Sequence, residues 1–438
     1  FVLVPSVGGR GDRMAQVLLG AVGVLVGLVA LALVAPRVLA AWAALLVRPF
    51  VAWAPFAARM ARSGMLRSPG RIGASASALA LVAAGFVGLR GLTDSLRGEI
   101  DSWAEQALHG KVWVKGLPAA NFDELSAHLR QDDAVLGVEM GQAQINVPFL
   151  VLGLDMESVR GYGALAEDPE LLEAMRSGHG MILSRRLAQD GQYSIGDSIY
   201  LEKSNHAIQP FRVVAISDAY GHWSNPDERM YGIIDRHYLD RYFCIETTRV
   251  DRVAVKLRGQ GPEDSERVME SLRAFYTGKS GREPGAWSVE TGHAIHAFHR
   301  YDLERDFRLF DVLVLLSAGL AGLGVLNGQL LATLERSKEL GIAKALGASR
   351  GQIAAMVWIE AFALSLVGGL LGMAVGVALI PPVVGSVESL SGLDLPPVIR
   401  GVVLVQALMG ALAVGTIAAI YPIYRLGRMD TLRAVRTG

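Results

Sequence analysis

Long apolar runs separated by charged stretches dominate the pattern of this chain. Five runs are long enough to cross a bilayer core as helices, which takes about 20 apolar residues, and none carries a lone Lys or Arg at its centre. The pattern predicts a polytopic α-helical membrane protein rather than buried helices of a water-soluble one. Pro36 is expected to end the first run, because proline lacks a backbone donor and clashes with the preceding turn.

The longest polar stretch lies between the second and third apolar runs. It contains short β-patterned segments, such as residues 198–202, and helical segments, such as residues 262–276. Strands and helices mixed over this length predict an α+β domain. The flanking segments, 93–108 and 291–310, have helical character and lead into the neighbouring spans, so we expect them to form stalks.

Positive charge indicates the orientation in the membrane. Cytoplasmic loops carry an excess of Lys and Arg. The three segments rich in these residues fall on one side of an alternating five-span arrangement, whereas the connector with Glu388 and Asp394 falls on the other. The expected orientation has the first residues outside, the last residues inside and the large insert outside the cytoplasm.

These patterns give a predicted layout in eleven segments. They are an external segment (1–14), an extra transmembrane helix (15–35), a basic amphipathic cytoplasmic segment (36–73), a transmembrane helix with stalk (74–93), an extracytoplasmic α+β domain with stalk helices (94–305), a transmembrane helix (306–333), a cytoplasmic coupling-helix loop (334–352), a transmembrane helix (353–380), an external loop (381–400), a transmembrane helix (401–424) and a cytoplasmic tail (425–438).

Composition adds little to this layout. Hydrophobic residues make up 51% of the 438 residues, and Lys+Arg and Asp+Glu both number 42, which gives no indication of a nucleic-acid partner. Cys244 is the single cysteine and excludes an internal disulfide framework. The chain opens at Phe1 without a signal-peptide pattern, which indicates a processed, truncated or renumbered start.

Three histidines in the lower stalk are the nearest approach to a metal site. His293, His296 and His299 lie at intervals of three, but the first and third point about 240° apart around a helix. They cannot all converge on one ion, so we favour a polar stalk surface over a metal site and expect no metal.

No catalytic or nucleotide-binding pattern is found elsewhere. Gly278-Lys279-Ser280 resembles the end of a phosphate-binding loop, but Arg273 stands where the earlier glycine is required. Ser184 lacks the flanking glycines of a nucleophile elbow and fits a helix N-cap. We therefore expect a chain that is not an enzyme and binds no cofactor.

Small and polar residues inside the spans predict helix packing. Small side chains let helix backbones approach closely in lipid, with a sliding surface between two halves as the alternative. Polar side chains there should face other helices, as structural hydrogen bonds rather than a substrate path. The residues are Gly319, Gly322, Gly368, Gly372 and Gly376, and Asn327, Gln329 and Glu360.

The loop between the third and fourth runs is compact and charged. Residues 335–346 are expected to form a helix, with Gly347 ending it and Ser349 capping the next. Mixed charges and modest amphipathicity favour docking to a soluble protein over lying on lipid. In the basic segment, by contrast, a pattern of apolar residues interleaved with arginines suits a helix on the inner leaflet. The residues are Trp53, Phe56 and Met60 with Arg59 and Arg62.

At these residues the chain resembles the FtsX-like/MacB-like ABC transporter permease family (type VII). The most specific match is the run from Glu335 to Ser349, ERSKELGIAKALGAS, which continues through Gln352 and Glu360-Ala361. The resemblance covers about residues 60–438. It includes Arg67-Ser68-Pro69-Gly70-Arg71, residues 182–187 and 211–214 of the insert, and Leu432-Arg433, although Thr431 stands near the family's usual tail proline.

The resemblance implies a permease subunit in the bacterial cytoplasmic (inner) membrane, with a MacB-like periplasmic domain. An ABC ATPase subunit, acting as a dimer and binding ATP and Mg, would dock on the loop and move the outer domain by mechanotransmission. The extra first span suggests the second half of a ten-span duplicated form. The expected contact residues are Glu335, Lys338, Glu339, Leu340, Ile342, Lys344, Leu346, Gly347 and Ser349.

The resemblance leaves the task of the outer domain open. One reading is export or extraction of a lipid, lipoprotein or amphiphile. The alternative is a signalling module that activates a periplasmic enzyme without transport. Further partners implied are a preceding permease half or second permease copy, a periplasmic protein or lipoprotein, and membrane lipids, with no nucleic acid.

Overall fold

A computed structural model describes residues 10–67, 69–143, 149–154, 169–203, 205–217, 230–243, 249–259, 262–280, 288–391 and 395–427. The chain divides into two compact units. The sheet unit comprises residues 1–17, 96–304 and 386–396, and the helical unit comprises residues 18–95, 305–385 and 397–438. Cys244, Asp394 and the tail residues Leu432-Arg433 lie outside the described residues.

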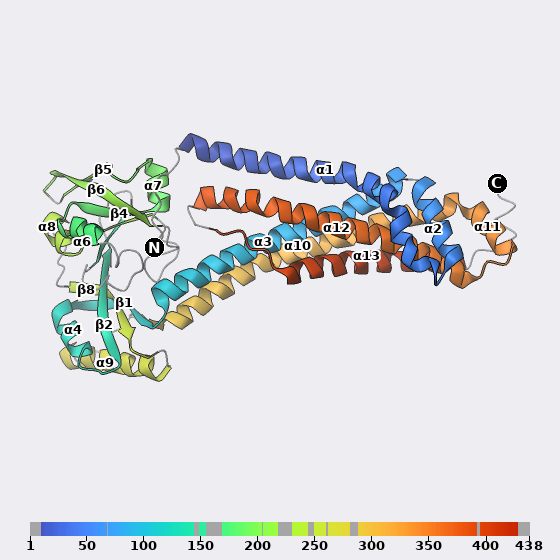
Figure 1. Ribbon diagram of the computed structural model, residues 1–438. Coiled ribbons are helices and arrows are strands. Elements are labelled where there is room, and N and C mark those ends of the chain that lie inside the picture. Colours follow the sequence, from blue (N-terminus) through green and yellow to red (C-terminus); the bar gives the residue numbers. More distant parts are fainter. Residues whose placement is uncertain are drawn as a thin grey trace. The chain divides into compact units, whose positions relative to one another are not determined.

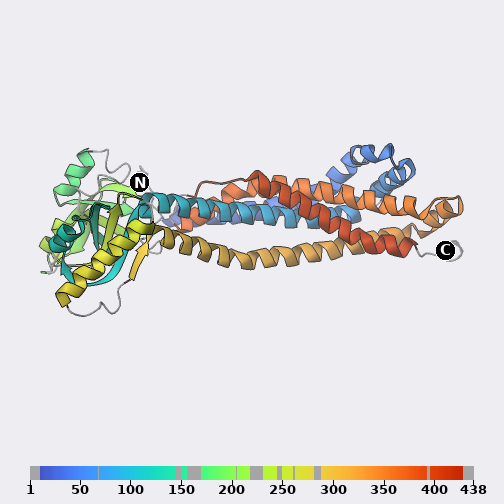
Figure 2. The same ribbon diagram turned by 90° about the horizontal axis from the view of Figure 1, so that it is seen from below.

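Long apolar helices build the helical unit. Among the described residues, five helices are long and apolar enough to cross a membrane, and they run side by side (Figures 1 and 2). They are α1 (Arg10–Val51), α3 (Pro69–Trp103), α10 (Gly292–Glu335), α12 (Arg350–Ser391) and α13 (Gly401–Gly427). Two short helices, α2 (Pro55–Arg67) and α11 (Ser337–Ala345), lie at one end of this bundle (Figure 1).

The expected stop at Pro36 is wrong, because α1 continues through Pro36 and Pro49 to Val51. The carbonyl of Ala32 loses its helical donor to proline, and the hydroxyl of Ser77 in α3 lies against it. Neighbouring helices commonly satisfy such groups in membrane helices. Helix α12 likewise continues through Pro381 and Pro382 to Ser391, so residues 381–391 of the expected external loop are helical.

The sheet unit is an α+β domain. Its described strands form one nine-stranded sheet in the order β5-β6-β4-β7-β3-β2-β8-β1-β9, with both parallel and antiparallel pairs. The strands are β1 (Lys111–Asn121), β2 (Val135–Ala143), β3 (Leu150–Leu154), β4 (Gly180–Ser184), β5 (Ser198–Glu202), β6 (Ile208–Ser217), β7 (Tyr231–Asp235), β8 (Arg249–Leu257) and β9 (Ser288–Thr291). A polytopic helical protein with an inserted α+β domain is thus confirmed.

Two apolar clusters hold the sheet unit together. One joins β1, β2 and β8 to α4 (Phe122–Leu129) and α9 (Pro262–Ser280), through residues such as Val255 and Leu272. The other joins β4, β6 and β7 to α7 (Arg185–Gly191) and α8 (His237–Phe243), with Phe211 at its centre. Helix α6 (Pro169–Arg176) packs near β4 and β6.

Local sequence explains several strands and caps. Edge strand β5 alternates exposed and buried residues, whereas the inner strands β4 and β7 are buried throughout, as their apolar runs require. The predicted N-cap is confirmed: Ser184 Oγ accepts the N–H of Leu187 at 3.3 Å, and also that of Tyr231 at 3.1 Å. Gly278-Lys279-Ser280 lies in helix α9 rather than a loop, which agrees with its rejection as a phosphate site.

Candidate docking site at the α11 loop

The loop between α10 and α12 has a defined local structure. Helix α10 ends at Glu335, Arg336 interrupts the helix, and α11 follows, so the single helix expected over residues 335–346 is divided. Gly347 has φ +100°, the left-handed conformation that glycine adopts without steric cost, which confirms its place just beyond the helix.

A capping box begins α12. The N–H of Gln352 donates to Ser349 Oγ at 3.2 Å, and the N–H of Ser349 donates to Gln352 Oε1 at 2.9 Å. The N-cap role predicted for Ser349 is confirmed, and the reciprocal bond from Gln352 fixes where the loop enters α12.

Apolar side chains project from α11 to the solvent. Ile342 is 54% exposed and Leu346, just beyond the helix, is 85% exposed. Leu340 differs from the expectation, because it is only 4% exposed and packs into the core of the helical unit. It anchors α11 to the bundle.

The charged residues of the loop differ in exposure, and one of them joins α11 to α2. Glu335 and Lys338 are exposed and Lys344 is half-buried. Glu339 forms an ion pair with Arg67 at the end of α2, a partner that the sequence pattern did not indicate. The pair joins α2 to α11 at the cytoplasmic end of the predicted topology.

A buried ion pair lies beneath α11. Arg336 Nη1 is 3.7 Å from Glu360 Oε2 in α12, and both residues are under 10% exposed. Gly64 of α2 covers the guanidinium: a Cβ at that glycine would lie 1.9 Å from Arg336 Nη1. Helices α2 and α12 and the junction between α10 and α11 therefore meet at one charge pair.

Two more polar residues of α10 were expected to face other helices, and they differ in burial. Gln329 is buried, whereas Asn327 lies on the exposed side of α10, contrary to the expectation.

The glycines of α12 contact α3 in register. A Cβ at Gly368, Gly372 or Gly376 would lie 3.0 Å or less from a carbonyl oxygen of α3. The three carbonyls belong to Ala76, Ala80 and Ala84, so steps of four match on two parallel helices. In α10, Gly322 lies against Val414 of α13, while nothing lies within 4 Å of a Cβ at Gly319.

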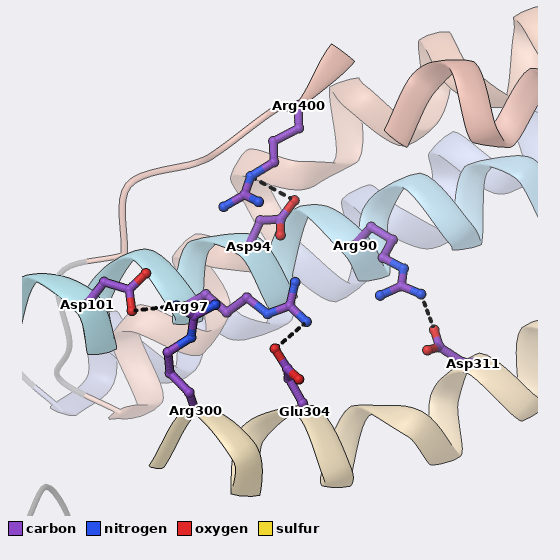
Figure 3. Close-up of polar contacts among 8 residues, drawn as sticks. All are labelled: Arg90, Asp94, Arg97, Asp101, Arg300, Glu304, Asp311 and Arg400. Atoms are coloured by element: carbon purple, nitrogen blue, oxygen red, sulfur yellow. Dashed lines mark ion pairs between the residues drawn. The ribbon is translucent and has the colours of Figure 1, made fainter. Parts of the chain in front are cut away.

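Charged residues also join α3 to α10 in the sheet unit (Figure 3). Arg97 Nη2 lies 3.5 Å from Glu304 Oε1, and Arg300 Nη1 lies 3.8 Å from Asp101 Oδ1. His296 Nε2 reaches the same Asp101 oxygen at 2.7 Å. The two ion pairs fit antiparallel helices. From the first pair to the second, the position rises by four residues along α3 and falls by four residues along α10.

In the helical unit, three polar contacts join α3 to α10 and to the segment before α13. Arg90 Nη2 lies 2.9 Å from Asp311 Oδ1 of α10 (Figure 3). Arg400 Nε lies 3.4 Å from the buried carboxylate of Asp94, and the N–H of Val398 donates to Ser95 Oγ at 3.2 Å. The segment before α13 is therefore fixed to α3.

The stalk histidines do not gather around one point. His296 pairs with Asp101, His299 contacts the edge of the Trp103 ring at 5.4 Å between centroids, and His293 is exposed. Among the described residues, no group of three or more His, Cys, Asp or Glu side chains could hold a metal ion.

Comparisons with known proteins agree with the loop motif. The family model described as FtsX-like permease C-terminal matches residues 312–431. A macrolide export ATP-binding/permease protein MacB of Bdellovibrio bacteriovorus is 27% identical over 253 residues, 55% of this chain and 36% of that protein. An uncharacterized ABC transporter permease protein of Mycobacterium tuberculosis, Rv0987, is 23% identical over 399 residues, 86% of this chain and 45% of that protein.

The relatives are longer than this chain. The chain spans less than half the length of these two relatives. The crystal structure of the periplasmic region of MacB from Actinobacillus actinomycetemcomitans aligns with a TM-score of 0.31 and 11% identity, over 44% of this chain and 94% of that one.

Proposed function

We propose that this chain, which belongs to the FtsX/MacB-like ABC transporter permeases, receives the motion of a cytoplasmic ABC ATPase on α11 and passes it to its outer α+β domain. The observation that carries the proposal is the exposure of Ile342 and Leu346, at 54% and 85%, on a short loop between two candidate spans. Neighbouring apolar side chains directed to water mark a surface that a partner covers.

The partner supplies the chemistry in this proposal. An ATPase dimer binds ATP and Mg, and this chain contributes no catalytic group. Basic segments at the α2 and α11 end support a cytoplasmic position for that end in a bacterial cell, with the sheet unit outside the cytoplasmic membrane. A second permease half or copy completes the membrane assembly.

Transmission follows the long helices. Arg336 is the only residue between α10 and α11, and α10 runs unbroken from Gly292 to Glu335. The buried pair with Glu360 ties the same point to α12. A displacement of α11 therefore acts on both helices, and the outer domain would use it to move a lipid, a lipoprotein or another amphiphile.

The experiment is purification of the tagged full chain from its own host, followed by measurement of associated ATP hydrolysis. Leu346→Asp and the charge reversal Lys344→Glu should remove both the ATPase subunit and the activity. Leu136→Asp, at a 54% exposed position of the sheet unit, is the matched control and should retain both. Equal ATPase recovery with Leu346→Asp would contradict the proposal.

A further inference from the structure

Helix α2 packs one of its faces against the helical unit. Ala57, Ala58, Ala61, Gly64 and Met65 are buried, and four of these five belong to the core cluster of the helical unit. Because these side chains pack on protein, they are not available to lipid. Helix α2 is therefore a fixed part of the bundle, whereas Phe56 and Met60, which were expected to face the inner leaflet, lie outside this buried set and are half-buried.

Two contacts set the position of α2 relative to α11. Arg67 pairs with Glu339 of α11, and Gly64 lies directly over the guanidinium of Arg336, which joins α10 to α11. Arg336 is held in turn by Glu360. Helices α2 and α11 are consequently held beside each other, and they form the two walls of a groove.

A groove of about 510 Å³ lies between these walls. Helix α2 contributes Phe56 and Met60, and the α11 side contributes Ile342, Ala343 and Leu346. Its lining is mainly apolar, and its size is within the range of about 300–1,000 Å³ typical of sites that enclose a small group. The groove continues directly from the exposed side chains assigned to ATPase docking.

The positive charge of helix α2 indicates which kind of partner surface fits beside the groove. Helix α2 carries Arg59, Arg62 and Arg67 and no acidic residue. Arg59 and Arg62 are exposed on α2 outside the lining, and Glu339, the acidic residue of the lining, is paired with Arg67. A surface that fits this groove presents an apolar side chain with acidic residues beside it, because opposite charges orient and select a partner.

We propose that α2 forms the second wall of the ATPase docking site, and that the groove between Met60 and Leu346 takes an apolar side chain of the ATPase flanked by acidic residues. This inference rests on the proposed function, since it concerns the same partner. It adds a contact from a helix outside the α11 loop. The partner then contacts both α2 and α11, so a displacement of the partner in either direction moves the permease helices.

The test uses a photo-cross-linking amino acid, p-benzoylphenylalanine, placed singly at positions 60, 346 and 66 of the full chain in its host membrane. Leu66 is the control, because it is exposed on α2 at 47% but does not line the groove. We expect positions 60 and 346 to cross-link to one protein that mass spectrometry identifies as an ABC ATPase, and position 66 to give no such product.

The possible outcomes separate the two proposals. An ATPase product from position 346 but only lipid or no product from position 60 overturns the inference and leaves the proposed function standing. An equal product from position 66 also overturns the groove assignment. The absence of an ATPase product from both 60 and 346 overturns the proposed function.

A substitution gives an independent measure of the α2 contact. Met60→Glu should lower the amount of ATPase retained on the purified chain by about tenfold relative to Leu66→Glu, as expected when an anchor side chain is lost from an interface. Thermal unfolding of both variants in detergent identifies any loss of folding. Equal retention by two folded variants overturns the inference.

Discussion

The hydroxyl oxygen of Ser77 in α3 lies 3.0 Å from the carbonyl oxygen of Ala32 in α1. Pro36 stands four residues beyond Ala32 and has no N–H for that carbonyl. Ser77 Oγ also lies 2.9 Å from the carbonyl oxygen of Gly73, within its own helix. A Cβ at Gly73 would lie 2.3 Å from Pro36 Cβ, so glycine makes room for the ring.

This relationship predicts that Ser77→Ala destabilises the helical unit by about 1–2 kcal/mol, because the Ala32 carbonyl then lacks a donor. Pro36→Ala restores an N–H at position 36, so the double variant Pro36→Ala/Ser77→Ala should lose less than the sum of the single changes. The measurement is a double-mutant cycle of unfolding in detergent. Additive effects would show that Ser77 does not compensate for Pro36.

Removal of the Glu360 carboxylate should leave the Arg336 charge buried. We expect Glu360→Ala to lower the free energy of unfolding by about 3–5 kcal/mol, the usual cost of breaking a buried pair. The apolar double variant Arg336→Met/Glu360→Leu should recover most of this loss, because no buried charge remains. Chemical unfolding of the purified chain measures both. Wild-type stability of Glu360→Ala would contradict the role given to this pair.

The contact between α3 and α12 depends on the absence of a side chain at Gly372. A Cβ there would lie 2.4 Å from the carbonyl oxygen of Ala80, so Gly372→Ala forces the helices apart at a cost of about 1–3 kcal/mol. Gly324→Ala in α10 is the matched control, since nothing lies within 4 Å of its Cβ. The two thermal midpoints should differ in opposite directions from wild type, because alanine favours an uncrowded helix.

Alkaline pH should test the core of the sheet unit. Burial raises the pKa of Tyr276 from 10.0 to about 12. Between these values the unfolded chain releases a proton that the folded chain keeps, so the free energy of unfolding falls as pH rises. From pH 9 to 11.5 the wild type should lose about 2 kcal/mol more than Tyr276→Phe.

The measurement for Tyr276 is urea unfolding of the full chain at both pH values. Tyr200→Phe, at a 67% exposed position of the same unit, is the matched control and should behave as wild type. An identical pH dependence in wild type and Tyr276→Phe would mean that Tyr276 ionises as readily in the folded chain as in the unfolded chain.

The local sequence pattern was sufficient to predict the spans, one edge strand and several helix caps of this protein. Each predicted apolar run lies within one of the long helices, because hydropathy over about 20 residues is a property of the run itself. Strand β5 begins and ends where its alternation does. The caps at Ser184 and Ser349 and the turn at Gly347 depend on neighbours within a few residues, so the sequence alone indicated them.

Tertiary structure decided what distant residues do to one another. Arg67 and Glu339 are 272 positions apart, and no local pattern could pair them. Leu340 and Leu346 are both apolar, yet packing against the bundle buries the first and leaves the second exposed. Pro36 is a helix breaker by its own chemistry, and the hydroxyl of Ser77 on another helix lies against the carbonyl that the proline leaves without a donor. The sequence by itself determined the elements, whereas burial and partners depend on which elements meet in space.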